Sequence, residues 1–209
     1  MSVLNRLACS LGRRDEVPNQ DLARDLAARR DRAAIRELAE NLRNRDRSIR
    51  ADCIKVIYEV GSLDPELIID YAEDFVSLLH SKDNRLVWGG MTALAEVAKK
   101  DPAAVFKHVD EIKAAKETGS VITVDQAVAA LSWTAAGSHR YNQAIFPYLL
   151  EHLAACRPKE VPQHAEKILP AVTAANHAAF VQVLEQRFAD LSAAGQSRVR
   201  KIIKQANSL

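Results

Sequence analysis

Few residues of this sequence have the types and spacing that chemistry needs. His152 and Cys156 lie four residues apart, so a helix would present both from one face, and imidazole nitrogen and thiolate are ligands that zinc accepts. Two ligands do not make a metal site, and we predict no metal and no cofactor. The sequence contains no glycine-rich phosphate loop, no HExxH motif and no GxSxG motif. We therefore predict that the protein is not an enzyme and that it acts by binding.

A repeated segment shows which elements would position the functional residues. Residues 46–65 and 83–102 match at a constant offset of 37 residues, and each segment begins with Asp and closes with Asp-Pro. A period of this length is typical of a solenoid, in which each helical repeat buries its apolar face against its neighbours.

Composition favours helices throughout the chain. Aromatic residues make up 5% of the sequence and there are 7 glycines, whereas a sandwich or barrel would need many β-branched runs and turn glycines. We predict an all-α fold, a right-handed α-α superhelix (solenoid) of about five helical hairpins in a single domain over residues 1–209. Residues 1–20 are expected to form an N-terminal capping helix and a connector. The hairpins are predicted at about residues 21–63, 64–100, 101–138, 139–175 and 176–209.

Capping residues and prolines predict where individual helices begin and end. One long helix is expected from Asp21 to about Leu42, and the next begins at Asp46 or Ser48. The Asp-Pro pairs combine an N-cap acceptor with a proline at the first helical position, so each is expected to open a repeat. Pro170 is expected to kink a helix over residues 164–174.

Residues 46–53 (DRSIRADC) resemble the turn and second-helix start of a HEAT repeat, and residues 197–200 (SRVR) resemble it again. The resemblance covers about residues 21–206, and the chain is identified as a HEAT-like, armadillo-type α-solenoid. It implies that the Asp and the Arg of this motif tie neighbouring repeats together. Asp83 keeps the acid, but Val87 or Trp88 stands where the Arg would fall.

The surface of the second helices is the predicted binding surface, because second helices of such solenoids usually line the concave face. Positions 59, 96 and 133 are equivalent at 37-residue steps, and positions 55, 92 and 166 belong to the adjacent turn. The predicted partner-binding residues are Lys55, Glu59, Thr92, Glu96, Trp133 and Glu166.

The two tryptophans allow different interpretations. Trp133 stands where two other repeats carry a glutamate, so it either lies exposed as a binding anchor or packs against the next repeat. Trp88 precedes Gly89 and Gly90 and is expected to fill the space that these glycines leave.

We predict a non-catalytic scaffold that binds a partner protein or peptide. The alternative is a DNA-binding protein related to HEAT-like DNA glycosylases for alkylated bases. That family has a catalytic Asp four residues after a Trp, but Thr92 follows Trp88 and Gly137 follows Trp133 at this spacing. The candidate phosphate contacts are some arginines near the N-terminus and four basic residues near the C-terminus: Arg198, Arg200, Lys201 and Lys204. For a HEAT-like lyase or chaperone that handles a tetrapyrrole, nothing in the sequence gives support beyond the fold class.

The charge distribution and the cysteine content indicate the cellular environment that we expect for the protein. The formal net charge is +2, with basic residues enriched at both ends and acidic residues in the middle, which solvated helix faces would explain. Cys9, Cys53 and Cys156 are far apart and odd in number, so a reduced, cytoplasmic protein is expected. No apolar run approaches the length of roughly 18 residues that spans a bilayer, and no membrane partner is expected.

Overall fold

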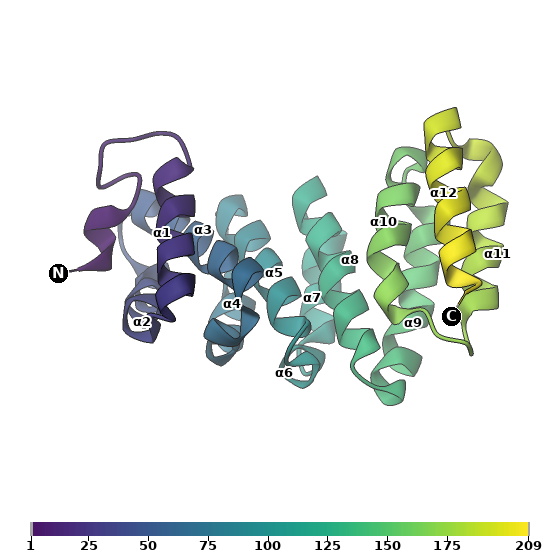
Figure 1. Ribbon diagram of the computed structural model, residues 1–209, viewed down its shortest axis with the longest axis horizontal. Coiled ribbons are helices and arrows are strands. Elements are labelled where there is room, and N and C mark those ends of the chain that lie inside the picture. The colour runs from purple at the N-terminus through teal and green to yellow at the C-terminus, as the bar shows by residue number, and fades with distance from the viewer. Residues whose placement is uncertain (1, 209) are drawn as a thin grey trace. The chain divides into compact units, whose positions relative to one another are not determined.

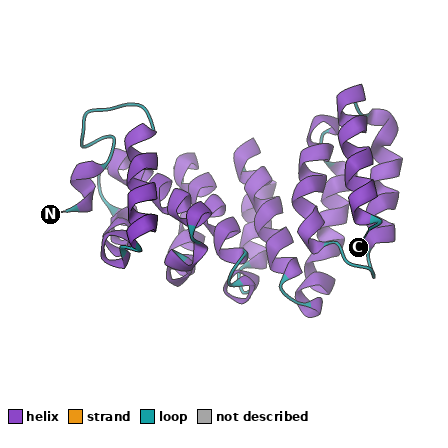
Figure 2. Cartoon of the chain, viewed as in Figure 1, coloured by secondary structure: helices purple, strands orange, loops and turns teal. Residues whose placement is uncertain are grey.

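The computed structural model describes residues 2–208, and all regular structure in that range is helical (Figure 1; Figure 2). The all-α prediction is therefore confirmed. The chain divides into two compact units, Met1–Ala130 and Leu131–Leu209, with the division inside helix α8 (Val121–Ala136). The first unit contains α1 (Val17–Arg29), α2 (Arg32–Glu40), α3 (Arg47–Leu63), α4 (Ala72–Leu78), α5 (Asn84–Ala98), α6 (Pro102–Phe106) and α7 (Val109–Glu117). The second unit contains α9 (His139–Ala155), α10 (Val161–Ile168), α11 (His177–Arg187) and α12 (Ala193–Ala206). Between residues 2 and 208, no helix is both long enough and apolar enough to cross a membrane.

Aspartates cap the predicted helix starts in the first unit. The carboxylate of Asp46 accepts from Ser48 N at 2.7 Å, and that of Asp83 accepts from Arg85 N at 3.1 Å. Asp101 caps α6 in the same way, accepting from Ala104 N at 2.9 Å. Each side chain satisfies a backbone N–H group that the first helical turn leaves without a partner.

The predicted long helix from Asp21 to Leu42 is wrong. Helix α1 begins earlier, at Val17, and ends at Arg29, and the backbone of the next residue, Arg30, is left-handed (φ 49°, ψ 45°). The Asp31 carboxylate then accepts from Ala34 N at 3.0 Å and starts α2. An aspartate at this point offers the backbone a cap in place of a continuing helix, and this local competition ends the first helix.

The first helices of the next two repeats are also broken. Short 3-10 turns at Pro65–Leu67 and Ile69–Tyr71 precede α4, and α6 is separated from α7 near His108. Each of these repeats therefore has a segmented first half followed by one long second helix, α5 or α8. The expected helix near the N-terminus is likewise only a 3-10 turn, Val3–Arg6, and Leu11 beyond it is 54% exposed.

The core follows the 37-residue period. Ile57 on α3, Leu94 on α5, Leu131 on α8 and Ile168 on α10 are all fully buried. Within the first unit, α3 packs between α1 and α5 (Figure 1). Each buried side chain of this size contributes roughly 1.5–3 kcal/mol, so this periodic spine contributes to the stability of both units.

Two glycines allow α5 to approach its neighbours closely. A Cβ atom at Gly89 would lie 2.8 Å from Cγ1 of Ile54 on α3, and one at Gly90 would lie 2.8 Å from the carbonyl oxygen of Phe75. The sequence suggested that Trp88 fills the space beside these glycines, and this prediction is wrong. Ile54 and Phe75 occupy that space, and the half-buried Trp88 ring packs instead against Tyr58, with ring centroids 5.8 Å apart.

Arginine–carboxylate pairs join adjacent repeats of the first unit. Arg47, at the start of α3, donates to both oxygens of Asp83, at 2.7 and 3.3 Å. Asp83 therefore links two repeats, as the HEAT resemblance implies, although its partner is Arg47. Arg50, which occupies the HEAT-like Arg position, instead donates to the carbonyl oxygen of Asn44 at 2.7 Å and holds its own turn.

In the second unit, α9 packs against α10 and α11, and α12 packs against α10 and α11. Helix α10 ends at Ile168 and passes into a 3-10 turn, Leu169–Ala171. The expected helix to Ala174 with a kink at Pro170 is therefore wrong. Pro170 lacks an N–H group and lies in the 3-10 turn that follows α10.

We predict that Gly89→Ala destabilises the protein by roughly 1–3 kcal/mol, because the added methyl group overlaps Ile54. In an Ile54→Ala background the overlap is gone, and the same substitution is expected to stabilise by up to about 1 kcal/mol through helix propensity. Chemical denaturation followed by circular dichroism measures both changes. As a control, Gly195→Ala in α12 meets its nearest atom at 3.4 Å and should show no loss. Equal destabilisation by Gly89→Ala in both backgrounds would contradict the packing argument.

Candidate functional site

Lys55 lies at the centre of a charged cluster in the first unit. Its ammonium contacts Glu59 Oε1 at 2.6 Å and Glu16 Oε2 at 2.8 Å, and it lies 5.0 Å from the centroid of the Tyr58 ring. The lysine side chain is only 7% exposed, whereas both carboxylates are more open to solvent. We call Glu16, Lys55, Tyr58 and Glu59 the Lys55 cluster.

The electrostatics of the Lys55 cluster keep the ammonium charged. Burial by itself lowers the pKa of Lys55, but its hydrogen bonds to Glu16 and Glu59 outweigh burial and hold that pKa above the ordinary lysine value. The cluster has two carboxylates around one ammonium, so the lysine charge is fully compensated, and an acidic ligand would have to displace carboxylates that already satisfy the lysine.

Thr92 and Glu96 on α5 are also engaged within the chain. The Thr92 hydroxyl donates to the carbonyl oxygen of Trp88 at 2.7 Å, one turn earlier on the same helix. Glu96 forms an ion pair with Lys99 and is 14% exposed. Because α3 packs directly against α5, the structure brings the four predicted residues of the first unit onto adjacent helices.

A separate hollow of about 380 Å³ lies in the second unit. Trp133 and Glu166, both predicted from the sequence, line it together with Leu169, Pro170 and Gln205. Trp133 is half-buried, so one part of the indole packs while another borders the hollow. We call these five residues the Trp133 hollow. Apolar walls with a few polar groups at the rim are typical of sites that accept an apolar side chain.

Glu166 is held in place by Arg198 of α12. The guanidinium donates from Nε and from a terminal nitrogen to the two carboxylate oxygens, each at 2.6 Å. Bidentate pairs of this kind fix the geometry of both groups. Arg200 lies over the Phe188 ring, 4.9 Å from its centroid. Two of the basic residues considered as phosphate contacts are therefore already engaged within the chain.

A larger cavity, of about 720 Å³, lies in the second unit and was not predicted from the sequence. Its walls come from the end of α8, the first half of α9 and the segment after α10, and include Phe146, Asn142 and Asn176. Asn176 Nδ2 donates to Asn142 Oδ1 at 2.9 Å, and Asn142 Nδ2 donates to the carbonyl oxygen of Ala171 at 2.8 Å. The two asparagines are 34 residues apart, which differs from the 37-residue period, so the repeat pattern does not predict this contact.

Two of the three cysteine thiols are poor nucleophiles. Burial raises the pKa of Cys53 to about 12, and burial together with the hydrogen-bonded Asp52 carboxylate raises the pKa of Cys9 to about 11. Burial also raises the pKa of Cys156, although the Arg187 guanidinium opposes this effect. Thiols in such surroundings carry little thiolate at neutral pH.

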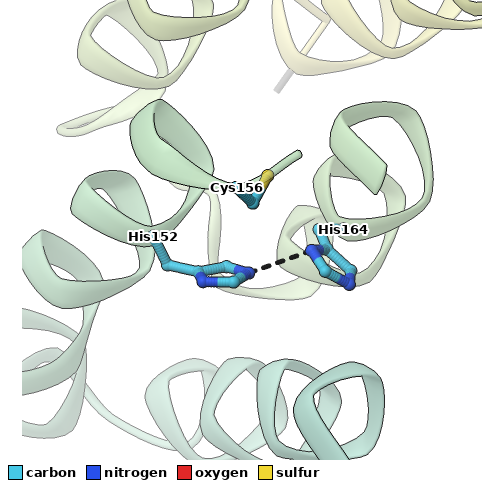
Figure 3. A group of neighbouring side chains, drawn as sticks. All are labelled: His152, Cys156 and His164. Carbon is cyan, nitrogen blue, oxygen red and sulfur yellow. Dashed lines mark hydrogen bonds between the residues drawn. The ribbon is translucent and has the colours of Figure 1, made fainter. Parts of the chain in front are cut away.

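The His152–Cys156 pair gains a third neighbour. His164 on α10 is 2% exposed, and its Nδ1 atom lies 2.9 Å from Nε2 of His152 (Figure 3). Sequence spacing identified the first two residues but missed His164, which lies on a different helix.

No protein-family model matches the chain, and no curated protein matches it. Among solved structures, it is similar to an engineered protein with a TM-score of 0.66 and 20% identity, covering 100% of this chain and 98% of the other. It is also similar to a designed armadillo repeat protein in complex with the peptide (KR)4, with a TM-score of 0.65 and 17% identity over 99% of each chain. Computationally designed armadillo repeat proteins for modular peptide recognition match with a TM-score of 0.63 and 15% identity, over 92% of this chain and 94% of the other. The fold is an armadillo-type α-solenoid, which confirms the repeat class predicted from the sequence.

In the Lys55 cluster, we predict that removing the lysine costs less stability than removing its two carboxylate partners. Lys55→Met is expected to destabilise by about 1–2 kcal/mol, because the two carboxylates left behind can be hydrated. Replacing both partners, Glu16→Gln with Glu59→Gln, is expected to cost about 3 kcal/mol or more, since it leaves a buried ammonium without a counter-charge. Urea denaturation near pH 7 compares the two.

The pH dependence of the double variant distinguishes an unpaired charge from lost packing. An unpaired buried lysine has a pKa below its unfolded value, so the unfolded state binds more protons and stability rises with pH. The deficit relative to the native sequence should therefore shrink between about pH 7 and about pH 9.5. A deficit that stays constant over this range would show that packing, rather than the charge, is responsible.

Proposed function

We propose that the protein is a non-catalytic scaffold that binds a segment of another protein on the surface of its second helices, centred on the Trp133 hollow. The observation that carries this proposal is the half-buried Trp133 at an open hollow with apolar walls and a fixed carboxylate. Tryptophans in such positions are favoured binding anchors, because they offer a large rigid surface at little entropic cost.

The fold supports the same kind of activity. A designed armadillo repeat protein with this arrangement was solved in complex with a peptide, (KR)4. The comparison supports peptide binding as a use of this fold. At 17% identity the binding side chains differ, so the ligand of this chain must be inferred from its own residues.

The chemistry of the hollow suggests the kind of segment it accepts. Leu169 and Pro170 suit an apolar side chain, and Gln205 at the rim can hydrogen-bond a peptide backbone. Glu166 is already paired with Arg198. It therefore favours a basic residue in the partner only where that residue can bind the carboxylate together with Arg198. We expect an apolar anchor residue with polar neighbours.

A library of displayed peptides, selected on the full chain, tests the proposal. Selected peptides should share an apolar anchor, and their binding, measured by calorimetry, should weaken at least tenfold in Trp133→Ala, a loss of about 1.4 kcal/mol or more. In a Trp88→Phe background Trp133 is the remaining tryptophan, so its fluorescence should change on binding. Charge reversal at Glu59 and Glu96 is expected to weaken partners that extend over the first unit.

Matched charge reversals away from the second helices serve as controls. Glu40→Lys on α2 and Glu185→Lys on α11 are exposed and should leave binding unchanged. If folded Trp133→Ala binds the selected peptides as well as the native sequence does, the hollow is not the site. Salt-sensitive duplex binding in a gel shift, together with no selected peptide, would favour the DNA-binding alternative.

A further inference from the structure

His152, Cys156 and His164 gather where α9 ends and α10 begins (Figure 3). One potential ligand atom from each residue lies within 4.8 Å of the other two. His152 is on the last turn of α9, and Cys156 is the residue that ends this helix, so the two share a face. His164 comes from α10, where its ring is almost completely buried.

We propose that His152, Cys156 and His164 form a zinc-binding site. Two imidazole nitrogens and one thiolate make a borderline-soft ligand set of the kind zinc prefers, with solvent in the fourth position. The site is independent of the Trp133 hollow and of the proposed function.

The present distances are close to those of a tetrahedral site. Zinc–nitrogen bonds of about 2.05 Å place two ligand nitrogens about 3.3 Å apart, and a zinc–sulfur bond of about 2.3 Å places the sulfur about 3.6 Å from each nitrogen. The nitrogens of His152 and His164 are now 2.9 Å apart and would separate by a few tenths of an ångström. The Cys156 sulfur lies within 4.8 Å of one ring nitrogen of each histidine and would approach by roughly an ångström, which a side-chain rotation can supply.

The hydrogen bond between the imidazoles already selects the atoms that would face the metal. In the neutral pair, one proton lies between Nε2 of His152 and Nδ1 of His164. Zinc would take the place of this proton, which moves to the outer nitrogen of the donor ring. The Cys156 thiol releases its proton to solvent on coordination, because the thiolate is the ligand.

Neighbouring groups hold the site in place and set its charge. Arg187 of α11 donates to the carbonyl oxygens of Cys156, Leu153 and Ala154, at 2.8, 3.0 and 2.6 Å, and so fixes the end of α9. The Glu160 carboxylate acts electrostatically on both Cys156 and His164 and supplies negative charge near the proposed cation. Arg187 works against the cation, but its own ion pair with Asp190, at 2.9 Å, offsets part of that charge.

Cobalt(II) substitution on the full chain, stripped with a chelator, tests the site. We expect one cobalt per chain, a thiolate-to-cobalt charge-transfer band in the near ultraviolet and the intense visible bands of a tetrahedral ion. Zinc should displace the cobalt and raise the Tm of the chain.

Variants assign the ligands. Cys156→Ser should abolish the charge-transfer band, and His152→Gln should weaken zinc binding by roughly tenfold or more, as loss of a direct ligand is worth at least as much as loss of its support. His164 is buried and its replacement could unfold the chain, so the other two variants carry the test, with circular dichroism confirming their fold. Cys9→Ser and His80→Gln, outside the cluster, should leave the band and the affinity unchanged.

The outcomes are decisive in both directions. Absence of the band in the native sequence, or its persistence in Cys156→Ser, overturns the proposal. Binding that does not depend on His152 overturns it as well. Binding of copper without zinc or cobalt would overturn the assignment of the metal.

Discussion

Packing of each second helix against the helices one repeat away is the interaction on which the rest of the first unit depends. Helix α3 buries Ile57 and Ile54 only because α1 and α5 lie against it, and α5 can come that close only because position 89 has no side chain. A single hairpin would leave these apolar faces in water.

Stacking therefore shapes the electrostatics of the candidate surface. The Lys55 side chain is buried beside the packed helices, and its ammonium stays charged because it forms ion pairs with Glu16 and Glu59. Arg47 and Asp83 are joined by the same one-repeat spacing that aligns the helices. In the second unit, Arg198 fixes Glu166 beside Trp133. Lys55, Glu96 and Glu166 on this surface are each paired with an opposite charge, whereas the Trp133 hollow offers apolar area to a ligand.

Much of this fold could be predicted, because its signals are local or periodic. The 37-residue recurrence placed Ile57, Leu94, Leu131 and Ile168 in the core, and the aspartate caps placed the starts of α3 and α5. The breaks in the first helices were missed. At Arg30 a left-handed residue and the Asp31 cap interrupt a pattern that otherwise continues, so apolar spacing alone cannot distinguish one helix from two.

Sequence by itself determined the helical class, the repeat length, the buried spine and the presence of Trp133 and Glu166 on second helices. These features follow from the periodicity of apolar residues, which can be read directly from the amino-acid sequence. Tertiary structure alone decided which side chains meet: Lys55 with Glu16, Glu166 with Arg198, and His164 with the His152–Cys156 pair. The physical reason is that such contacts depend on the angle and separation of two packed helices, and sequence spacing describes only one helix at a time.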